Sequence, residues 1–265
     1  MGEVHGATHV VIPDSQVKPG VPIDHLSWIG RYIVDQFGGK PNVKVIHLGD
    51  FWDLPSLSSY DKGKKSMEGR RYMADVEAGN VGMEVLNEAL ASAKRWKPDL
   101  HLLRGNHENR IERAIEADAQ LDGLLTMDDL LSPGWQVHDF LVPVVLDGVT
   151  YAHYFYAPMS GRPYGGMVES RLKTIGFSFT QGHQQTLGYG VRFVGNRSQH
   201  GLVAGSAYLH SEDYRGPPGN HEWRGIIVCH EVRDGSYDPM FVSLDFLCRK
   251  YEGKPLAKFR PRVFA

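Results

Sequence analysis

Three observations predict an α/β fold for this 265-residue sequence. Short apolar runs alternate with stretches of helical periodicity through the first half of the chain. The second half carries strand-like runs that Gly and Pro separate. The composition, with 42% hydrophobic and 23% charged residues, is typical of a globular protein. Because no repeat, low-complexity tract or linker interrupts the chain, we predict one domain over residues 1–265.

The first half is expected to contain three buried strands, at residues 8–12, 43–48 and 100–103. Between them, apolar residues recur at helical spacing from Ile23 to Phe37 and from Val76 to Ala93, which predicts two helices. Each strand runs directly into a polar loop. This alternation of strand, loop and helix places polar side chains at the carboxyl ends of strands, where open α/β sheets usually hold their ligands.

The second half is expected to be richer in strands. Asp147-Gly148 is a two-residue hairpin signal between strands at 141–146 and 149–155. Further strands are predicted at 175–180, 191–194, 226–232 and 241–247.

Five short polar motifs follow one another along the chain. They are Asp14-Ser15-Gln16, Gly49-Asp50-Phe51-Trp52-Asp53, Gly105-Asn106-His107-Glu108, a lone His153, and Gly182-His183-Gln184-Gln185. The series resembles the calcineurin-like metallophosphoesterase family, including its phage and DNA-repair members, whose pattern is D-x-H, GDxxD, GNH-E/D, H and GHxH. The resemblance spans residues 14–185. It implies a four-layer αββα sandwich of two mixed β-sheets flanked by helices.

The resemblance also implies a pair of divalent metal ions. Phosphate esters are anionic and water is a poor nucleophile, so two cations roughly 3.5–4 Å apart neutralise the phosphoryl oxygens and lower the pKa of a bridging water. Asp50 would bridge the two ions. The first ion would be held by Asp14, Gln16, Asp50 and Gln185. The second would be held by Asp50, Asn106, His153 and His183.

Two positions depart from the family pattern, because Gln16 and Gln185 stand where it has histidine. The first site would therefore be an all-oxygen site, weaker than the second, unless a water replaces Gln185. Oxygen ligands favour Mn²⁺ or Mg²⁺ over Zn²⁺, whereas the imidazoles of the second site suit Zn, Fe, Ni or Mn. Mn²⁺ is the expected ion, and Mg²⁺, Fe and Zn²⁺ are the alternatives. A glutamine in the first motif also occurs in manganese-dependent ADP-ribose/CDP-alcohol pyrophosphatases.

The resemblance assigns catalysis to Asp50 and to His107, which would protonate the leaving group, a role worth typically 10²–10⁴-fold. Asp53 and Glu108 would orient His107 and the ligands. Arg104 is a candidate phosphate contact, with a strand-end salt bridge as the equal alternative. Basic residues also gather in two loops, near 54–72 and, with Arg162, near 156–174. These loops are either substrate surfaces or solvated faces.

The function expected from these features is metal-dependent hydrolysis of phosphate esters. Phosphodiesters of nucleotides or nucleic acid are favoured over monoesters. A nucleotide pyrophosphatase and a non-catalytic metal-binding scaffold are the alternatives. A net charge of −2 provides no global basic field, so contacts with a polyanion must be local. Without a signal peptide or a membrane-spanning stretch, the expected location is cytoplasmic, with no membrane partner. A second Gly-Asn-His-Glu string at 219–222 is expected to be a loop.

Overall fold

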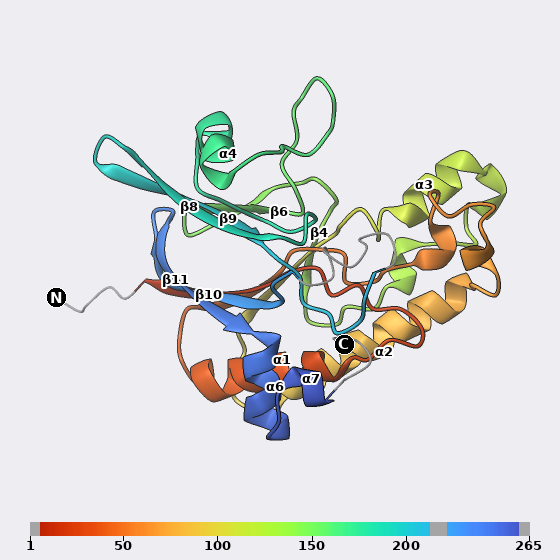
Figure 1. Cartoon of the computed structure of the whole chain (residues 1–265), viewed down its shortest axis with the longest axis horizontal. Coiled ribbons are helices and arrows are strands. Elements are labelled where there is room, and N and C mark those ends of the chain that lie inside the picture. The colour runs from red at the N-terminus through yellow and green to blue at the C-terminus, as the bar shows by residue number, and fades with distance from the viewer. Residues whose placement is uncertain (1–5, 213–221, 260–265) are drawn as a thin grey trace.

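The computed structural model describes residues 6–212 and 222–259, whose strands form two mixed β-sheets (Figure 1). The six-stranded sheet, in the order β11-β10-β1-β2-β3-β4, contains β1 (Ala7–Ile12), β2 (Val43–His47), β3 (Asp99–Leu103), β4 (Gln136–His138), β10 (Gly225–Arg233) and β11 (Ser236–Ser243). The five-stranded sheet, in the order β5-β6-β7-β9-β8, contains β5 (Val144–Leu146), β6 (Val149–Ala152), β7 (Phe179–Gln181), β8 (Leu187–Val194) and β9 (Arg197–Ala204). Parallel and antiparallel pairs occur in both sheets.

Helices cover the outer faces of the sheets, as Figure 1 shows. One large apolar cluster joins the six-stranded sheet to α1 (Asp24–Phe37), α2 (Tyr72–Ala91) and α6 (Leu244–Glu252). α4 (Val168–Ile175) packs on the outer face of the five-stranded sheet. The other α-helices of the described residues are α3 (Arg110–Ala117) and α7 (Leu256–Phe259). The arrangement is a four-layer α/β sandwich, which confirms the predicted fold class.

The central strands β1 and β2 of the six-stranded sheet are buried on both faces. On β1, Val10 and Ile12 belong to the cluster on the helix side, whereas Val11 belongs to a second cluster between the sheets. Tyr151 and Leu202 contribute to this inter-sheet cluster from the five-stranded sheet. Because side chains alternate along a strand and both faces are covered, the sequence of such a strand is continuously apolar.

Two predicted strands each divide between a strand and a helix. Residues 175–180 contain the end of α4 and the start of β7, because Gly176 adopts a φ of 85° and ends the helix. Residues 241–247 contain the end of β11 and the start of α6. The Ser243 hydroxyl accepts a hydrogen bond from the Phe246 amide (3.1 Å) and caps the helix at this point.

The predicted hairpin between β5 and β6 is confirmed. Asp147 and Gly148 both have positive φ, 48° and 84°, as a two-residue hairpin turn of the favoured twist requires. The predicted strand at 149–155 is shorter in the structure and ends at Ala152. His153 therefore lies just beyond the carboxyl end of β6 and not inside the strand.

In the described ranges, no helix has both the length and the apolar character needed to cross a membrane. Most of the second Gly-Asn-His-Glu string, residues 219–221, lies outside the described residues.

Candidate metal centre

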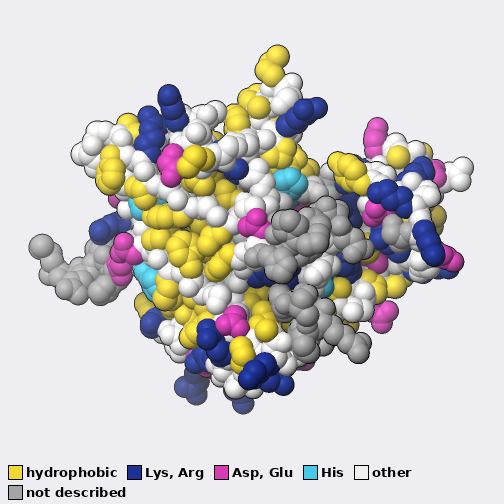
Figure 2. Space-filling view, in the orientation of Figure 1, with side chains coloured by type: hydrophobic (Ala, Val, Ile, Leu, Met, Phe, Trp, Pro, Cys, Tyr) yellow, Lys and Arg dark blue, Asp and Glu magenta, His cyan; other side chains and the backbone are white. Residues whose placement is uncertain are grey.

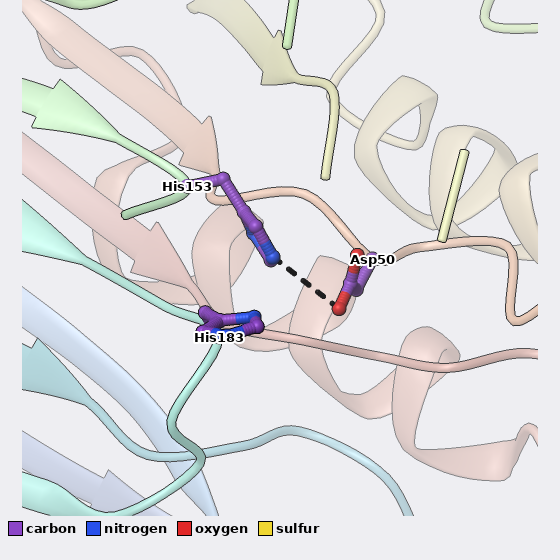
Figure 3. A group of neighbouring side chains, drawn as sticks. All are labelled: Asp50, His153 and His183. Atoms are coloured by element: carbon purple, nitrogen blue, oxygen red, sulfur yellow. Dashed lines mark ion pairs between the residues drawn. The ribbon is translucent and has the colours of Figure 1, made fainter. Parts of the chain in front are cut away.

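Three of the predicted ligands meet where the two sheets adjoin (Figure 3). Asp50 follows β2 of the six-stranded sheet, and His153 and His183 follow β6 and β7 of the five-stranded sheet. Their candidate ligand atoms all lie within 4.8 Å of one another. Asp50 Oδ2 is 3.3 Å from His153 Nε2. The loops at the carboxyl ends of these strands therefore form one polar cluster.

Asn106 completes the second predicted ligand set. Its Oδ1 atom lies 2.9 Å from His153 Nε2 and 2.7 Å from His183 Nδ1. Two donors that bind one ion at about 2.1 Å and at right angles are about 3 Å apart. The spacing of these donor atoms thus fits a single divalent cation.

A backbone contact fixes the tautomer of His153. Its Nδ1 atom lies 2.8 Å from Leu48 O, and because a carbonyl only accepts, Nδ1 carries a proton. Nε2 then faces the oxygens of Asp50 and Asn106, which are also acceptors. Burial lowers the pKa of His153, but the Asp50 carboxylate outweighs burial and raises it to about 9. Without a metal ion, a proton on Nε2 satisfies this cluster.

Asp14 fits the role of a ligand to a second cation. Its Oδ1 atom accepts a hydrogen bond from the His183 amide (3.0 Å), whereas its buried Oδ2 atom has no hydrogen-bond partner among the described residues. Burial, and then repulsion by the Asp50 carboxylate, raises the pKa of Asp14 to about 7. A buried carboxylate oxygen without a partner is costly unless a cation or a proton neutralises it.

Both glutamines lie buried beside these carboxylates. The backbone amide of Gln16 donates to Asp50 O (2.8 Å), which ties the first motif to the second. Gln185 Oε1 accepts a hydrogen bond from the Tyr208 hydroxyl (2.9 Å). The amide oxygen of Gln185 therefore already has a protein partner.

Two glycines of the motifs pack directly against the carboxylates of the centre. A Cβ atom on Gly105 would collide with Asp50 Oδ1, and one on Gly182 would collide with Asp14 Oδ1. The glycines therefore leave room for the two carboxylates.

Four predicted ligands have left-handed φ values between 44° and 64°: Gln16, Asp50, His183 and Gln185. Such residues typically cost about 1–3 kcal/mol each and cluster at functional sites.

Glu108 holds two of the motif loops together. Its Oε2 atom accepts from the amides of Gly105 (2.7 Å) and Asp50 (3.0 Å), and its Oε1 atom accepts from those of Phe51 (2.6 Å) and Trp52 (3.0 Å). Four backbone donors fix this buried carboxylate. Glu108 therefore positions the backbone of Asp50, and it acts on the proposed metal site through that backbone.

His107 lies beside the cluster and is held on both ring nitrogens. Its Nδ1 atom is 2.7 Å from Asp53 Oδ1, and its Nε2 atom is 3.1 Å from Arg110 Nη2. Burial lowers the pKa of His107, but Asp50 and Asp53 outweigh burial, so the pKa is above its ordinary value. Lys18 pairs with the second oxygen of Asp53 (2.8 Å) and keeps that carboxylate in place.

A cleft of about 1020 Å³ opens above the centre. Asp50, Asn106, His107, His183 and Gln185 contribute to its walls. Both basic and acidic side chains line the rest of it. The basic ones are Lys18, Lys64, Arg70, Arg71 and Arg110, and the acidic ones are Asp53, Asp61, Glu68, Asp75 and Glu212.

The two predicted substrate-binding arginines do not belong to the described lining of this cleft. Arg104 pairs with Asp139 (2.9 Å), which is the strand-end salt bridge that the sequence left open. Arg162 is exposed in the second basic loop. In the same loop, Arg171 is buried and donates to Gly166 O and Gln184 Oε1, so it stabilises the loop itself.

Sequence reasoning missed Arg110 and Lys18, which do line the cleft. Arg110 follows His107 by three residues, and its amide donates to His107 O (3.0 Å) in a turn that enters α3. Side chains three residues apart in such a turn share one side, so this spacing was the available signal. No comparable local signal exists for Lys18, whose contact with Asp53 is long-range.

No protein-family model matches this sequence, and a search of curated proteins finds no significant match. The likeness to calcineurin-like metallophosphoesterases thus rests on the order of the motifs and stays a prediction.

Proposed function

We propose that the protein is a metal-dependent phosphoesterase of the calcineurin-like kind that hydrolyses phosphodiesters. One observation carries this proposal: Asp50, Asn106, His153 and His183 converge with the spacing of a cation site in a cleft that His107 also lines. The oxygens of Asp50 and Asn106 and the imidazoles of His153 and His183 are the kinds of ligand that hold a divalent transition-metal ion.

The donor set defines how divalent ions would be held. One ion fits Asp50, Asn106, His153 and His183, and a second fits Asp50 and Asp14 with Gln16 and Gln185 beside them. When bound, such ions neutralise phosphoryl oxygens and lower the pKa of an attacking water. Mixed oxygen and nitrogen ligands with carboxamides favour Mn²⁺, with Mg²⁺, Fe and Zn²⁺ as alternatives.

His107 is proposed to protonate the leaving-group oxygen from Nε2. Asp53 holds the Nδ1 proton, so Nε2 is the nitrogen that exchanges its proton within the cleft. In the free protein Arg110 occupies the position opposite Nε2. A phosphate oxygen placed there would accept from the Arg110 guanidinium and would free Nε2 to carry the proton. Arg110 thus takes the phosphate-binding role for which Arg104 was one candidate from the sequence.

The size of the cleft supports diesters over monoesters. Pockets for small ligands usually measure about 300–1,000 Å³, so a cleft of about 1020 Å³ has room for groups on both sides of a phosphate.

The test is hydrolysis of bis(4-nitrophenyl) phosphate and of 4-nitrophenyl phosphate by protein stripped of metal and then loaded with Mn²⁺, Mg²⁺ or Zn²⁺. The proposal predicts Mn²⁺-dependent cleavage of the diester, weaker cleavage of the monoester, and none with chelator or in Asp50→Asn. A dinucleoside pyrophosphate tests the pyrophosphatase alternative. Metal binding without turnover of any of these esters would instead support a metal-binding scaffold.

A further inference from the structure

The cleft extends away from the metal centre along residues 54–72. Arg110, beside His107, donates to the carbonyl oxygens of Asp53 (2.8 Å) and Leu54 (3.2 Å), so the start of this loop is anchored next to the proposed acid. The cleft lining continues along the loop with Tyr60, Lys64, Arg70 and Arg71. We call these four residues the basic arm. The side of the cleft that receives the leaving group therefore leads into the basic arm.

Two cations of the basic arm are available to a ligand. Arg71 donates to Arg70 O (3.0 Å) and forms no ion pair with any carboxylate of the described chain. Lys64 pairs with Asp61 (3.1 Å), but its side chain is 60% exposed, and such exposed pairs contribute little. Arg70 differs, because it holds the loop together through Asp61 (3.0 Å) and Pro55 O (2.9 Å).

The arm also presents an aromatic ring. Tyr60 lines the cleft and is 81% exposed. Single-stranded nucleic acids bind to surfaces where cations track the phosphates and aromatic rings stack on the bases, because every base has a face to stack. Two carboxylates line the cleft beside the basic arm and limit its net charge: Glu68 is exposed, and Asp61 pairs with Lys64 and Arg70.

The net charge of the protein does not by itself attract a polyanion. The net charge is −2, and acidic and basic side chains are interspersed over the lobe that contains α3, at the right of Figure 2. Binding of a polyanion must depend on local groups, and the basic arm supplies them next to the proposed reaction centre.

We infer that the substrate is a single-stranded oligonucleotide whose leaving-group strand lies along the basic arm. Lys64 and Arg71 bind its phosphates, and Tyr60 stacks on a base. This inference rests on the proposed phosphodiesterase function and adds the substrate class to it.

The test compares Lys64→Gln/Arg71→Gln with the control Lys62→Gln/Lys65→Gln, which removes the same charge from the same loop outside the cleft lining. Each protein is assayed with bis(4-nitrophenyl) phosphate and with a short fluorescent oligodeoxynucleotide, whose binding is also followed by anisotropy without turnover. The arm variant should bind the oligonucleotide roughly tenfold more weakly and should reduce the salt dependence by about one charge for each lost contact. The control variant should cleave the small diester as the parent does.

Equal oligonucleotide binding by the arm and control variants would overturn the inference, even if the small diester is hydrolysed. Absence of diester hydrolysis in the parent would instead contradict the proposed function, and the anisotropy measurement would still decide on the arm. Tyr60→Ala should weaken binding of the oligonucleotide but not of inorganic polyphosphate. If Tyr60→Ala changes neither, the arm binds phosphates alone and the assignment to nucleic acid is wrong.

Discussion

On the imidazole side of the candidate metal centre (Asn106, His153 and His183), the donor atoms already lie about as far apart as ligands of one ion. On the glutamine side (Asp14, Gln16 and Gln185), one carboxylate oxygen is buried without a partner among the described residues. There, the amide oxygen of Gln185 accepts from Tyr208. Asp50 lies between the two sides.

The two sides therefore differ in what they offer a cation: the imidazole side offers ligands already in position, and the glutamine side offers the negative charge of a carboxylate. The imidazole side is preorganised, because Leu48 O fixes the His153 tautomer and no ligand must move far. The glutamine side supplies one carboxylate, Asp14, and no imidazole. We therefore expect two cation sites of unequal affinity, with the tighter one on the imidazole side.

Asp50→Ala should have the largest effect, because it should affect metal binding on both sides of the centre. Asp50 contacts the ligands on one side and repels Asp14 on the other, so its loss removes the carboxylate common to both sites. We expect metal binding and diester hydrolysis to be abolished, as measured by calorimetric titration with Mn²⁺ and by turnover. Retention of two bound ions in Asp50→Ala would show that the sites do not share a ligand.

His107→Ala should separate catalysis from metal binding on both sides. Asn106 and not His107 belongs to the cluster of ligands, so Mn²⁺ affinity should change little. Turnover of a diester with a poor leaving group should fall about 10²-fold or more, because that oxygen needs a proton as it departs. The loss should shrink for a 4-nitrophenyl leaving group. Equal losses on both substrates would argue against a general acid.

Metal affinity on the imidazole side should depend on pH. In the metal-free protein the pKa of His153 is about 9, so below this pH a proton on Nε2 competes with the ion. Affinity for Mn²⁺ should therefore rise by up to about tenfold per unit between pH 7 and 8.5. His153→Gln should flatten this dependence, as followed by calorimetry in buffers of different ionisation enthalpy.

The same proton affects the stability of the metal-free protein. The folded-state pKa of His153 is raised above its ordinary value of 6.5, so its contribution is complete below pH 6.5 and is lost as pH rises through about 9. The melting temperature of metal-free protein, relative to that of His153→Gln, should fall over this window. A rising difference would mean that His153 is neutral in the folded state.

The fold and the imidazole side could be foreseen for the same reason. Strands buried on both faces are continuously apolar, and their carboxyl ends bring Asp50, His153 and His183 together whatever the details of the loops. The sequence left out contacts set by distant segments. The Tyr208 hydroxyl on Gln185 and the Lys18 contact with Asp53 join residues far apart in the chain, and neither has a local pattern.

Arginines were predicted less well, because a basic residue near a motif has several partners of similar energy. Arg104 reaches Asp139 on the neighbouring segment, and Arg171 turns inward to backbone carbonyls. Only the three-dimensional arrangement separates them from Arg110, which faces the cleft. The position of basic residues in the sequence therefore indicates which loops lie near the site, but not which side chain faces the cleft.

Restoring imidazoles on the glutamine side should produce the smallest change and should make the two sides alike. Gln16→His/Gln185→His is expected to tighten the weaker site by roughly tenfold and to shift its preference from Mn²⁺ toward Zn²⁺, because imidazole is the softer ligand. Competition between the two metals measures this preference. An unchanged preference would show that these glutamines do not contact the ion.

Unequal cation binding around one shared aspartate is the central claim, and Mn²⁺ binding counted by electron paramagnetic resonance tests it most directly. The parent should bind two ions with separable affinities, and His153→Gln should lose the tighter class while the weaker class persists. Loss of the weaker class alone in His153→Gln, or no bound Mn²⁺ in the parent at any concentration, would contradict the account.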